Sequence, residues 1–463
     1  MGTFSIRDYH AVGDGVTVDT EAFQNAIDAC RAAGGGTVLV PPGRWLCGSL
    51  RLCSNMELHL EPGSVIICNL VPEDMKSDDG FSEKAAYYHF AAIDEENISV
   101  TGTGVIDGQG ILTREEDDGI SEYPLLPDFT LRANTFYFRG CNNISMKDVT
   151  LRDASLWTVR MIGCRHVDIS GIKILNCLRG ANNDGIDPDA CCDVTIRGCY
   201  IEGGDDAIVV KTTKAATERY GPCEDILVTG CTLISRGSAV KIGTETWGDI
   251  RRVLFTNCII KESNRGLGIW VRDGGTVEDI HVSDLLIETR MWGGANFREV
   301  TPDWWGKGEP LFFSAGYRYH GKPQYPGKIR RVRVSNITAK SENSIFMGGC
   351  PESSIENVLL ENVVLRFDKR SNEQSGQFDE QPPELGNSVY RHNTPGVYMR
   401  RCKDCEIDGL RVDWGEKPEP EWSHLAELEL CENIDLRRIY GKAAQPDLEL
   451  IAANECEQIS VDS

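Results

Sequence analysis

Three copies of one short pattern lie within residues 166–228: His166-Val167-Asp168-Ile169, Asp193-Val194-Thr195-Ile196 and Asp225-Ile226-Leu227-Val228. Further copies precede and follow them. The key aliphatic residues of the first six copies, starting at Ile144, lie 23, 27, 32, 27 and 27 residues apart. Short alternating apolar segments with turns between them are typical of β-strands. Self-similarity at this period predicts a solenoid, which grows by adding coils and not by adding domains.

A second regularity in the sequence supports stacked coils. Five residues after the key aliphatic residue, ten copies of the pattern have an apolar residue or a cysteine: Val149, Ile172, Cys199, Cys231, Cys258, Leu285, Ile337, Val363, Val412 and Ile439. Such a column predicts an internal ladder of side chains from successive coils. Cys199, Cys231 and Cys258 are therefore expected to be buried thiols in one stack and not metal ligands.

These repeats predict an all-β fold, a right-handed parallel β-helix, as one domain over residues 1–463. The hand follows from the general chirality of crossover connections. Residues 20–33 break the pattern, because apolar residues recur there at helical spacing between Thr20, as N-cap, and Gly34. We expect a capping helix here, since the end of a solenoid otherwise exposes unpaired strand edges.

The overall composition excludes several classes of function. The net charge of −23 argues against nucleic-acid binding, which depends mostly on Lys and Arg. No apolar stretch approaches the roughly 18 residues of a membrane-spanning helix. The first residues have no basic and apolar leader, and the 18 cysteines lack the spacing of a disulfide scaffold. These features predict a cytoplasmic protein with no membrane partner.

No cofactor or metal signature is present in the sequence. No His-x-x-His or Cys/His pattern has metal-site spacing, and Cys402-x-x-Cys405 lacks a second pair. No phosphate-binding glycine loop or nucleotide fingerprint occurs. We therefore expect neither a metal nor a cofactor, and we leave a homo-oligomer open.

Two motifs place three carboxylates at tight glycine turns: Asn183-Asp184-Gly185-Ile186-Asp187 and Gly203-Gly204-Asp205-Asp206. Asp184 and Asp205 are 21 residues apart, which is about one coil, so they are expected on neighbouring rungs. Clustered carboxylates in different surroundings are what acid–base cleavage of a glycosidic bond requires. The alternative is that Asp205 and Asp206 only cap backbone groups at a coil corner.

With these motifs, the chain resembles the family-28 glycoside hydrolases, the polygalacturonase family. Three further segments support the resemblance, which covers most of residues 4–290: Asp8–Gly15, Gly35–Gly43 and Leu58–Gly63. The resemblance implies that Asp205 is the general acid and that Asp184 and Asp206 activate the attacking water. The physical argument agrees, because two adjacent carboxylates do not both ionise cheaply, and a carboxylate across a water gives inversion.

The chain departs from the family at the residues that surround the acid. Counting back from Ile242-Gly243, Ser238 stands in the place of the family's histidine. Gly268 and Trp270 stand in the places of an Arg and a Lys that grip the sugar carboxylate. Strand alternation places Lys241 one rung from Gly268, roughly 4.8 Å away.

Two explanations of these departures remain open. Lys241 and Arg265 supply the missing positive charge from neighbouring rungs, or the sugar is neutral and stacks on Trp270. Structural alternatives are a solvated Lys241, an Arg265 paired with Asp206, and a packing role for Trp270 and Arg272 under residues 290–328. The candidate substrate-binding residues are thus Lys241, Arg265, Trp270, Arg272, Ser238 and Asn183.

Three segments interrupt the repeat: residues 108–135, residues 369–386, which are polar, and residues 290–328, which are rich in aromatic residues. Long loops on a solenoid tend to build its binding face. The aromatic residues of 290–328 either stack on sugar rings or pack together as a small core, and both interpretations stand.

The function expected is an inverting glycoside hydrolase that acts from the end of short, pectin-derived or other uronate-containing oligosaccharides. One alternative is a polysaccharide lyase with Ca²⁺ and with Lys241 or Arg265 as base. Its Ca²⁺ cage would be Asp184, Asp187, Asp189, Asp205 and Asp206. Others are an intramolecular glycosyl transferase, a hydrolase of neutral oligosaccharides and a non-catalytic carbohydrate-binding β-helix.

Overall fold

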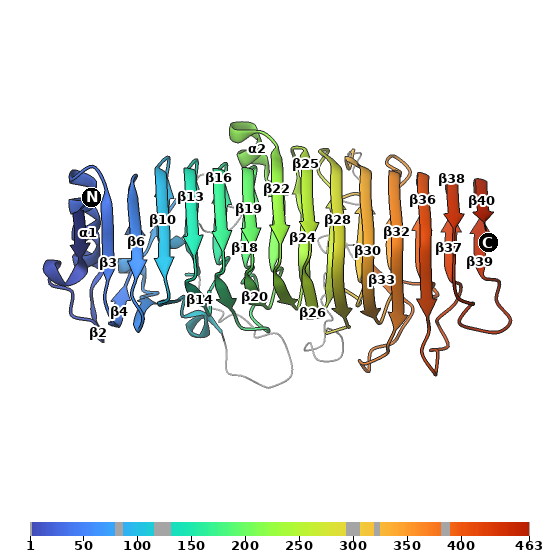
Figure 1. Cartoon of the computed structure of the whole chain (residues 1–463), viewed down its shortest axis with the longest axis horizontal. Coiled ribbons are helices and arrows are strands. Elements are labelled where there is room, and N and C mark those ends of the chain that lie inside the picture. Colours follow the sequence, from blue (N-terminus) through green and yellow to red (C-terminus); the bar gives the residue numbers. More distant parts are fainter. Residues whose placement is uncertain are drawn as a thin grey trace. The chain divides into compact units, whose positions relative to one another are not determined.

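The computed structural model describes residues 2–78, 87–114, 131–292, 306–318, 325–380 and 389–462. The chain forms two compact units, one of Met1–Val209 with Ala215–Cys231 and one of Val210–Lys214 with Thr232–Ser463. Each unit is a stack of parallel strands (Figure 1). The predicted fold class, a right-handed parallel β-helix, is confirmed.

The first unit has three rows of strands, and strands within a row pair in parallel. The first row is β1 (Gly2–Ser5), β3 (Gly36–Val40), β6 (Met56–Leu60), β10 (Glu96–Gly102), β13 (Asn142–Lys147), β16 (Arg165–Ser170), β19 (Cys192–Arg197) and β22 (Cys223–Thr229). The second row is β2 (Asp14–Val18), β4 (Gly43–Cys47), β7 (Ser64–Cys68), β11 (Val105–Asp107), β14 (Thr150–Arg152), β17 (Lys173–Leu175) and β20 (Tyr200–Gly203). The third, called the β18 row, is β5 (Leu50–Arg51), β9 (Tyr87–Ile93), β12 (Ala133–Arg139), β15 (Val159–Ile162) and β18 (Ile186–Asp189).

The second unit has a row of longer strands beside a row that we call the β24 row. The longer strands are β25 (Ile250–Thr256), β28 (Thr276–Thr289), β30 (Lys328–Ser341), β32 (Ile355–Phe367), β36 (Cys402–Asp413), β38 (Glu432–Arg437) and β40 (Glu457–Asp462), with β23 (Thr232–Ser235) and β26 (Ile259–Ser263). The β24 row is β24 (Ser238–Thr246), β27 (Arg265–Val271), β29 (Leu311–Ala315), β31 (Ile345–Gly348), β35 (Val397–Arg400), β37 (Ala426–Glu429) and β39 (Ile451–Asn454).

A few elements lie outside these rows. β21 (Ile208–Thr212) and α2 (Lys214–Tyr220) each contribute residues to both units. β8 (Lys76–Ser77) pairs antiparallel with β9, and β33 (Gln377–Asp379) pairs antiparallel with β34 (Val389–Arg391). Three short 3₁₀ turns are η1 (Ile6–Tyr9), η2 (Pro72–Asp74) and η3 (Gly110–Thr113).

The predicted internal ladder is present in each unit. In the first unit the key aliphatic residues stack in register, Ile144 on Val167 and Val167 on Val194. Of the ten predicted ladder residues, nine are buried, and Ile439 is partly exposed. Burial of Cys199, Cys231 and Cys258 is confirmed, with exposed fractions of 2%, 1% and 2%.

α1 (Thr20–Ala32) occupies all but the last residue of the expected helix. It contacts β1 and β3, and Figure 1 shows it beside β3. Its buried residues follow helical spacing, namely Phe23, Ala26, Ile27 and Cys30. The predicted N-cap was wrong by one residue. Asp19 takes that position, and its carboxylate accepts bonds from the N–H groups of Val12 (2.7 Å) and Gly13 (3.0 Å) instead of capping the helix.

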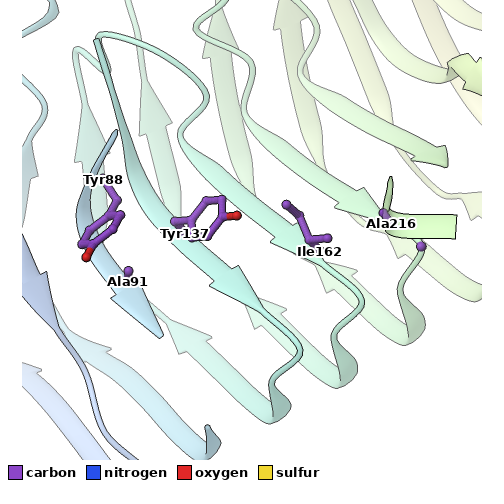
Figure 2. Packing of buried hydrophobic residues seen from close by; sticks show 6 residues of the cluster. Tyr88, Ala91, Tyr137, Ile162 and Ala216 are labelled. Atoms are coloured by element: carbon purple, nitrogen blue, oxygen red, sulfur yellow. The ribbon is translucent and has the colours of Figure 1, made fainter. Parts of the chain in front are cut away.

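The outer face of the β18 row is covered in part by α2. A cluster of buried residues joins β9, β12 and β15 to this helix, as Figure 2 shows. Its members are Tyr88, Ala91, Tyr137, Ile162, Ala190 and Ala216. In the described part of the chain, no helix is long and apolar enough to span a membrane.

The interrupting segments are described only in part. Residues 115–130, 293–305, 319–324 and 381–386 lie outside the described residues, including Phe297, Trp304, Trp305 and Tyr319. In the described part of 290–328, Phe312 and Phe313 are fully buried in β29, and the Trp292 Nε1–H donates to the Glu262 carbonyl (2.8 Å). These three aromatic residues follow the packing alternative, whereas Tyr325 is 46% exposed.

The burial of the thiols predicts slow chemical labelling of the native protein. All 18 cysteines are free thiols, and only Cys177, Cys192 and Cys456 are partly exposed. Burial, together with Asp193, raises the pKa of Cys192 to about 11, and burial also raises the pKa of Cys456, so Cys177 should react first. Mass mapping after timed treatment with a disulfide reagent would check this, with the denatured protein as control. Rapid native labelling of Cys199 or Cys231 would contradict the stacked-thiol interpretation.

Candidate active site

The structure brings Asp184, Asp205 and Asp206 together, as the one-coil spacing predicts. Asp184 lies just before β18, whereas Asp205 and Asp206 lie between β20 and β21. The Gly185 N–H donates to the Asp206 carbonyl (3.0 Å), which places the two segments on adjacent rungs. One carboxylate oxygen of each residue lies within 4.8 Å of the others. Asp184 and Asp206 are 5% and 3% exposed, while Asp205 is partly exposed.

Asn183 holds the turn that carries Asp205. Its Oδ1 accepts bonds from the N–H groups of Gly204 (2.8 Å) and Asp205 (3.2 Å), and its Nδ2 donates to the Cys177 carbonyl (2.8 Å). The side chain is 1% exposed. These contacts give Asn183 a supporting role in this structure, and substrate binding by Asn183 stays a prediction.

Asp205 accepts a hydrogen bond on each of its two carboxylate oxygens. Oδ1 accepts from the Asp206 N–H (2.9 Å), and Oδ2 accepts from Nδ2 of Asn182 (3.3 Å). Nη1 of Arg132 donates in turn to Oδ1 of Asn182 (3.2 Å). Sequence reasoning missed both residues. Asn182 directly precedes the Asp184 motif, whereas nothing in the sequence connects Arg132 with it.

A third missed residue, Asn176, supports the turn from behind. Its Nδ2 donates to Oγ1 of Thr158 (2.7 Å) and to the Asn183 carbonyl (2.8 Å), and its Oδ1 accepts from the Ala154 N–H (2.9 Å). The side chain is 5% exposed. A buried amide with its hydrogen bonds made in this way fixes the backbone on which Asp184 is mounted.

In the second unit, strand alternation correctly places Lys241 beside Gly268, because the two pair in register. The Trp270 ring fills the space that a side chain at position 268 would need. A Cβ on Gly268 would lie 2.2 Å from two ring atoms of Trp270. The Lys241 Nζ lies 5.4 Å from the centroid of the same ring, within cation–π range.

The remaining second-unit candidates are buried, which for Trp270 favours the packing alternative, whereas Arg265 pairs with Glu309 and not as that alternative expected. Arg265 is 2% exposed, and its guanidinium makes two bonds to the Glu309 carboxylate (3.0 and 3.3 Å), which makes Glu309 its partner. Trp270 is 1% exposed and packs against Phe312 with ring centroids 5.3 Å apart. Ser238 is 3% exposed and pairs in register with Arg265. Direct substrate contact by these residues stays a prediction.

Arg272 is a buried cation held by carbonyl oxygens. It is 1% exposed and donates to the Ser314 carbonyl (2.8 Å), to Oγ of Ser314 (3.0 Å) and to the Glu380 carbonyl. Burial lowers the pKa of Arg272 to about 10. Because Ser314 belongs to residues 290–328, these contacts follow the alternative in which Arg272 packs under that segment.

Lys241 belongs to a charged group that we call the Glu245 cluster: Lys211, Lys241, Glu245 and Arg318. Burial opposes ionisation of Glu245, but Lys211, Arg318 and Lys241 outweigh it and lower the pKa of Glu245 to about 2. Arg318 also makes two bonds to the Asp273 carboxylate, both 2.6 Å long. Lys241 is partly buried in this cluster, so it is not simply a solvated surface lysine.

Comparison with known proteins assigns the family. Residues 38–291, more than half of the chain, match the profile described as "Glycosyl hydrolases family 28". A probable polygalacturonase of Vitis vinifera is 32% identical over 392 residues, which cover 78% of this chain and 74% of that protein. The chain belongs to glycosyl hydrolases family 28. It is therefore a glycoside hydrolase.

Further relatives of this family 28 chain differ in coverage. A probable polygalacturonase of Arabidopsis thaliana is 29% identical over 45% of this chain and 42% of its own length. An exopolygalacturonase from Thermotoga maritima has a TM-score of 0.67 at 25% identity, covering 80% of this chain and 88% of that one. A family 28 exopolygalacturonase from Yersinia enterocolitica has a TM-score of 0.68 at 17% identity, covering 100% and 78%, and this likeness shows the fold alone.

The Ca²⁺ cage of the lyase alternative is not assembled among the described residues of this family 28 enzyme. Only Asp184, Asp205 and Asp206 of its five members come together. Asp189 instead forms a buried ion pair with Arg160 (2.8 Å), and Asp187 is fully buried. Ca²⁺ takes about six to eight oxygen ligands, so these three carboxylates would need bidentate binding or water molecules to complete its shell.

The tight packing of Gly204 leads to a prediction about the turn before Asp205. A Cβ on Gly204 would lie 2.2 Å from the Gly180 carbonyl oxygen, so Gly204→Ala must displace this turn. Because a displacement near 1 Å costs about 100-fold in rate, kcat/KM should fall by about that factor. Gly203→Ala is the matched control, since its nearest contact is 3.3 Å. Similar activity of the two variants would show that the turn does not need this close approach.

Proposed function

We propose that this family 28 enzyme is an inverting hydrolase that removes sugars from the end of short, uronate-containing oligosaccharides derived from pectin. The observation that supports it most is the group of three carboxylates within 4.8 Å on adjacent rungs. In family 28, the motifs that carry these residues are the catalytic ones that the sequence resemblance implies.

The proposed chemistry has two proton transfers, one to the oxygen of the glycosidic bond and one from the water that attacks the anomeric carbon. Asp205, the most exposed of the three carboxyls, gives its proton to the glycosidic oxygen as the bond to the anomeric carbon breaks. A water held between Asp184 and Asp206 attacks that carbon from the opposite face and gives its proton to one of them. The products are a shortened oligosaccharide and a sugar with inverted configuration, with one water consumed.

The proposal of inversion rests on the family resemblance and not on the carboxylate separation. The nearest oxygens lie within 4.8 Å, which is less than the roughly 6.5–9.5 Å between the carboxyl groups of most inverting glycosidases. Two of the carboxyls in this site share the task of activating water. The usual relation between separation and outcome, which assumes a single base, therefore does not apply directly.

Attack at the chain end is supported by the packed aromatic residues on the outward face of the β24 row. Lys241 pairs with Gly268, and the column continues in register through Phe312, Phe346 and Tyr398. Together with Trp270 and Phe378 these aromatic residues form a buried cluster. Among the described residues, the side chains of Phe312, Phe346 and Tyr398 in this column are buried and are not exposed to a sugar chain. The Thermotoga maritima relative, an exopolygalacturonase, agrees with this mode of attack.

An anionic sugar is favoured over a neutral one in this proposal. The neutral-sugar alternative needs an exposed Trp270, and Trp270 is 1% exposed. Lys241 offers a positive charge on the outward face, beside the position that carries an Arg in the family. A cytoplasmic enzyme would meet only imported short fragments. Eighteen free cysteines, fifteen of them buried, agree with that reducing compartment.

The role of Asp205 can be tested with Asp205→Asn on trigalacturonate. Wild type should release galacturonate stepwise from one end and add one water per bond. Asp205→Asn should lose about 1,000-fold in kcat because the proton donor is gone. Mass spectrometry measures the water, and NMR of the first product measures its anomeric configuration.

Asp193→Asn is the matched control for this test, because Asp193 is exposed on β19 and has a positive φ (55°) that Asn accepts. Products that sum to the substrate mass would instead support a lyase or an intramolecular transferase. A ladder of internal cleavage products would contradict attack at the chain end, and a retained configuration would contradict inversion.

The role of Lys241 can be tested by comparing charged and neutral substrates. Lys241→Met removes the ammonium and keeps the apolar stem over Trp270. Loss of one charge-assisted hydrogen bond should lower kcat/KM on trigalacturonate by about 10–100-fold. Activity on the methyl-esterified trimer should change little. Lys173→Met, at an exposed position of β17, is the control. An equal loss on both substrates would show that Lys241 does not recognise the carboxylate.

A further inference from the structure

We propose that Arg132 is a positioning residue for the general acid, because it fixes the Asn182 amide whose N–H donates to Asp205. The inference rests on the proposed role of Asp205 and adds a residue from outside the family motifs. Arg132 directly precedes β12 and is 50 residues from Asn182 in sequence. The three residues lie in the first unit.

The guanidinium of Arg132 is clamped between two segments of the chain. Its Nε donates to the Ser155 carbonyl (2.6 Å), and its Nη2 donates to the Ala181 carbonyl. Ser155 is itself fixed, because its hydroxyl bonds to the N–H (3.0 Å) and the carbonyl (3.2 Å) of Ala133. A planar fork that meets several carbonyl oxygens is a geometry that Arg provides and Lys does not.

This clamp determines which way the Asn182 amide faces. The guanidinium has donors and no acceptor, so the Asn182 atom that it contacts (3.2 Å) must be the carbonyl oxygen Oδ1. The amide nitrogen is therefore on the other side, where it lies 3.3 Å from Oδ2 of Asp205. Without Arg132 the amide could rotate and present its oxygen to the carboxyl instead.

The backbone at Asn182 also suits this arrangement. Its φ is +52°, a conformation that Asn and Gly adopt more easily than other residues. The Asn182 amide and the Asp206 N–H bind different oxygens of Asp205, so together they fix the plane of this carboxyl. A proton donor must be aimed at the leaving oxygen, and the carboxylates of Asp184 and Asp206 lie beside Asp205.

The test uses two substrates that differ in their need for an acid. Digalacturonate has a basic sugar leaving group that must be protonated, whereas 4-nitrophenyl α-galacturonide has an acidic one that leaves with little help. Arg132→Met and Asn182→Gly should each lower kcat on digalacturonate by about tenfold, with KM and the kcat on the aryl substrate nearly unchanged. Asn182→Gly avoids strain at the positive φ.

Two further variants separate positioning from charge and from stability. Arg132→Met/Asn182→Gly should be no slower than Asn182→Gly alone, because Arg132 acts through that amide. Arg132→Lys keeps the charge but not the fork, so it should stay near the activity of Arg132→Met. Melting temperatures are recorded for each variant to show that it is folded at the assay temperature.

Each outcome bears on the inference. Equal losses on both substrates, an additive double variant, full activity of Arg132→Lys or no effect of Arg132→Met would each overturn the positioning role while leaving the proposed function intact. A wild-type protein that cleaves neither galacturonide would overturn the proposed function, and the inference with it. Loss confined to digalacturonate and not increased in the double variant is the expected result.

Discussion

The parallel register between successive coils is the constraint on which the candidate active site depends. Asp184 and Asp205 belong to successive coils of the β-helix. They meet because β17 and β20 pair residue by residue, with Ile174 beside Ile201 in the buried core. A slip of one residue would turn every side chain of a strand to the opposite face. The apolar ladder inside the helix therefore aligns the carboxylates outside it.

Three carboxylates within 4.8 Å repel one another when ionised, so the site needs compensation from its surroundings. One such contact comes from a neutral amide, because the Asn182 Nδ2 donates to Oδ2 of Asp205 (3.3 Å). Asn176, Asn182 and Asn183 are close in sequence, and each uses its oxygen and its nitrogen on different partners. An amide can accept from one turn and donate to the next without adding charge. This property suits a site in which the three carboxylates carry the charge that the proposed reaction uses.

The sequence predicts those features that repeat. Periodic aliphatic residues predict the coils, the buried thiols and the pairing of Lys241 with Gly268, because parallel pairing repeats the same geometry at every rung. It does not predict contacts made by single turns and insertions. The position of Arg265 follows from the repeat. Its partner Glu309 does not, because Glu309 comes after residues 293–305, an insertion whose length is unrelated to the repeat period. Arg132 and Asn182 meet for a similar reason, since neither belongs to the repeat.

The departures from the family motif at Gly268 and Trp270 are physically coupled. The Trp270 ring occupies the space over Gly268. The Cβ of an Arg at position 268 would lie 2.2 Å from atoms of this ring and would collide with it. Trp270 in turn is held by Phe312 and the aromatic column, which would lose a large buried contact if a Lys replaced it. Neither position can regain the family residue alone. A positive charge on this outward face must therefore come from a neighbouring rung. Lys241 supplies it from the rung in register with Gly268, where its ammonium faces both the indole and the ionised Glu245.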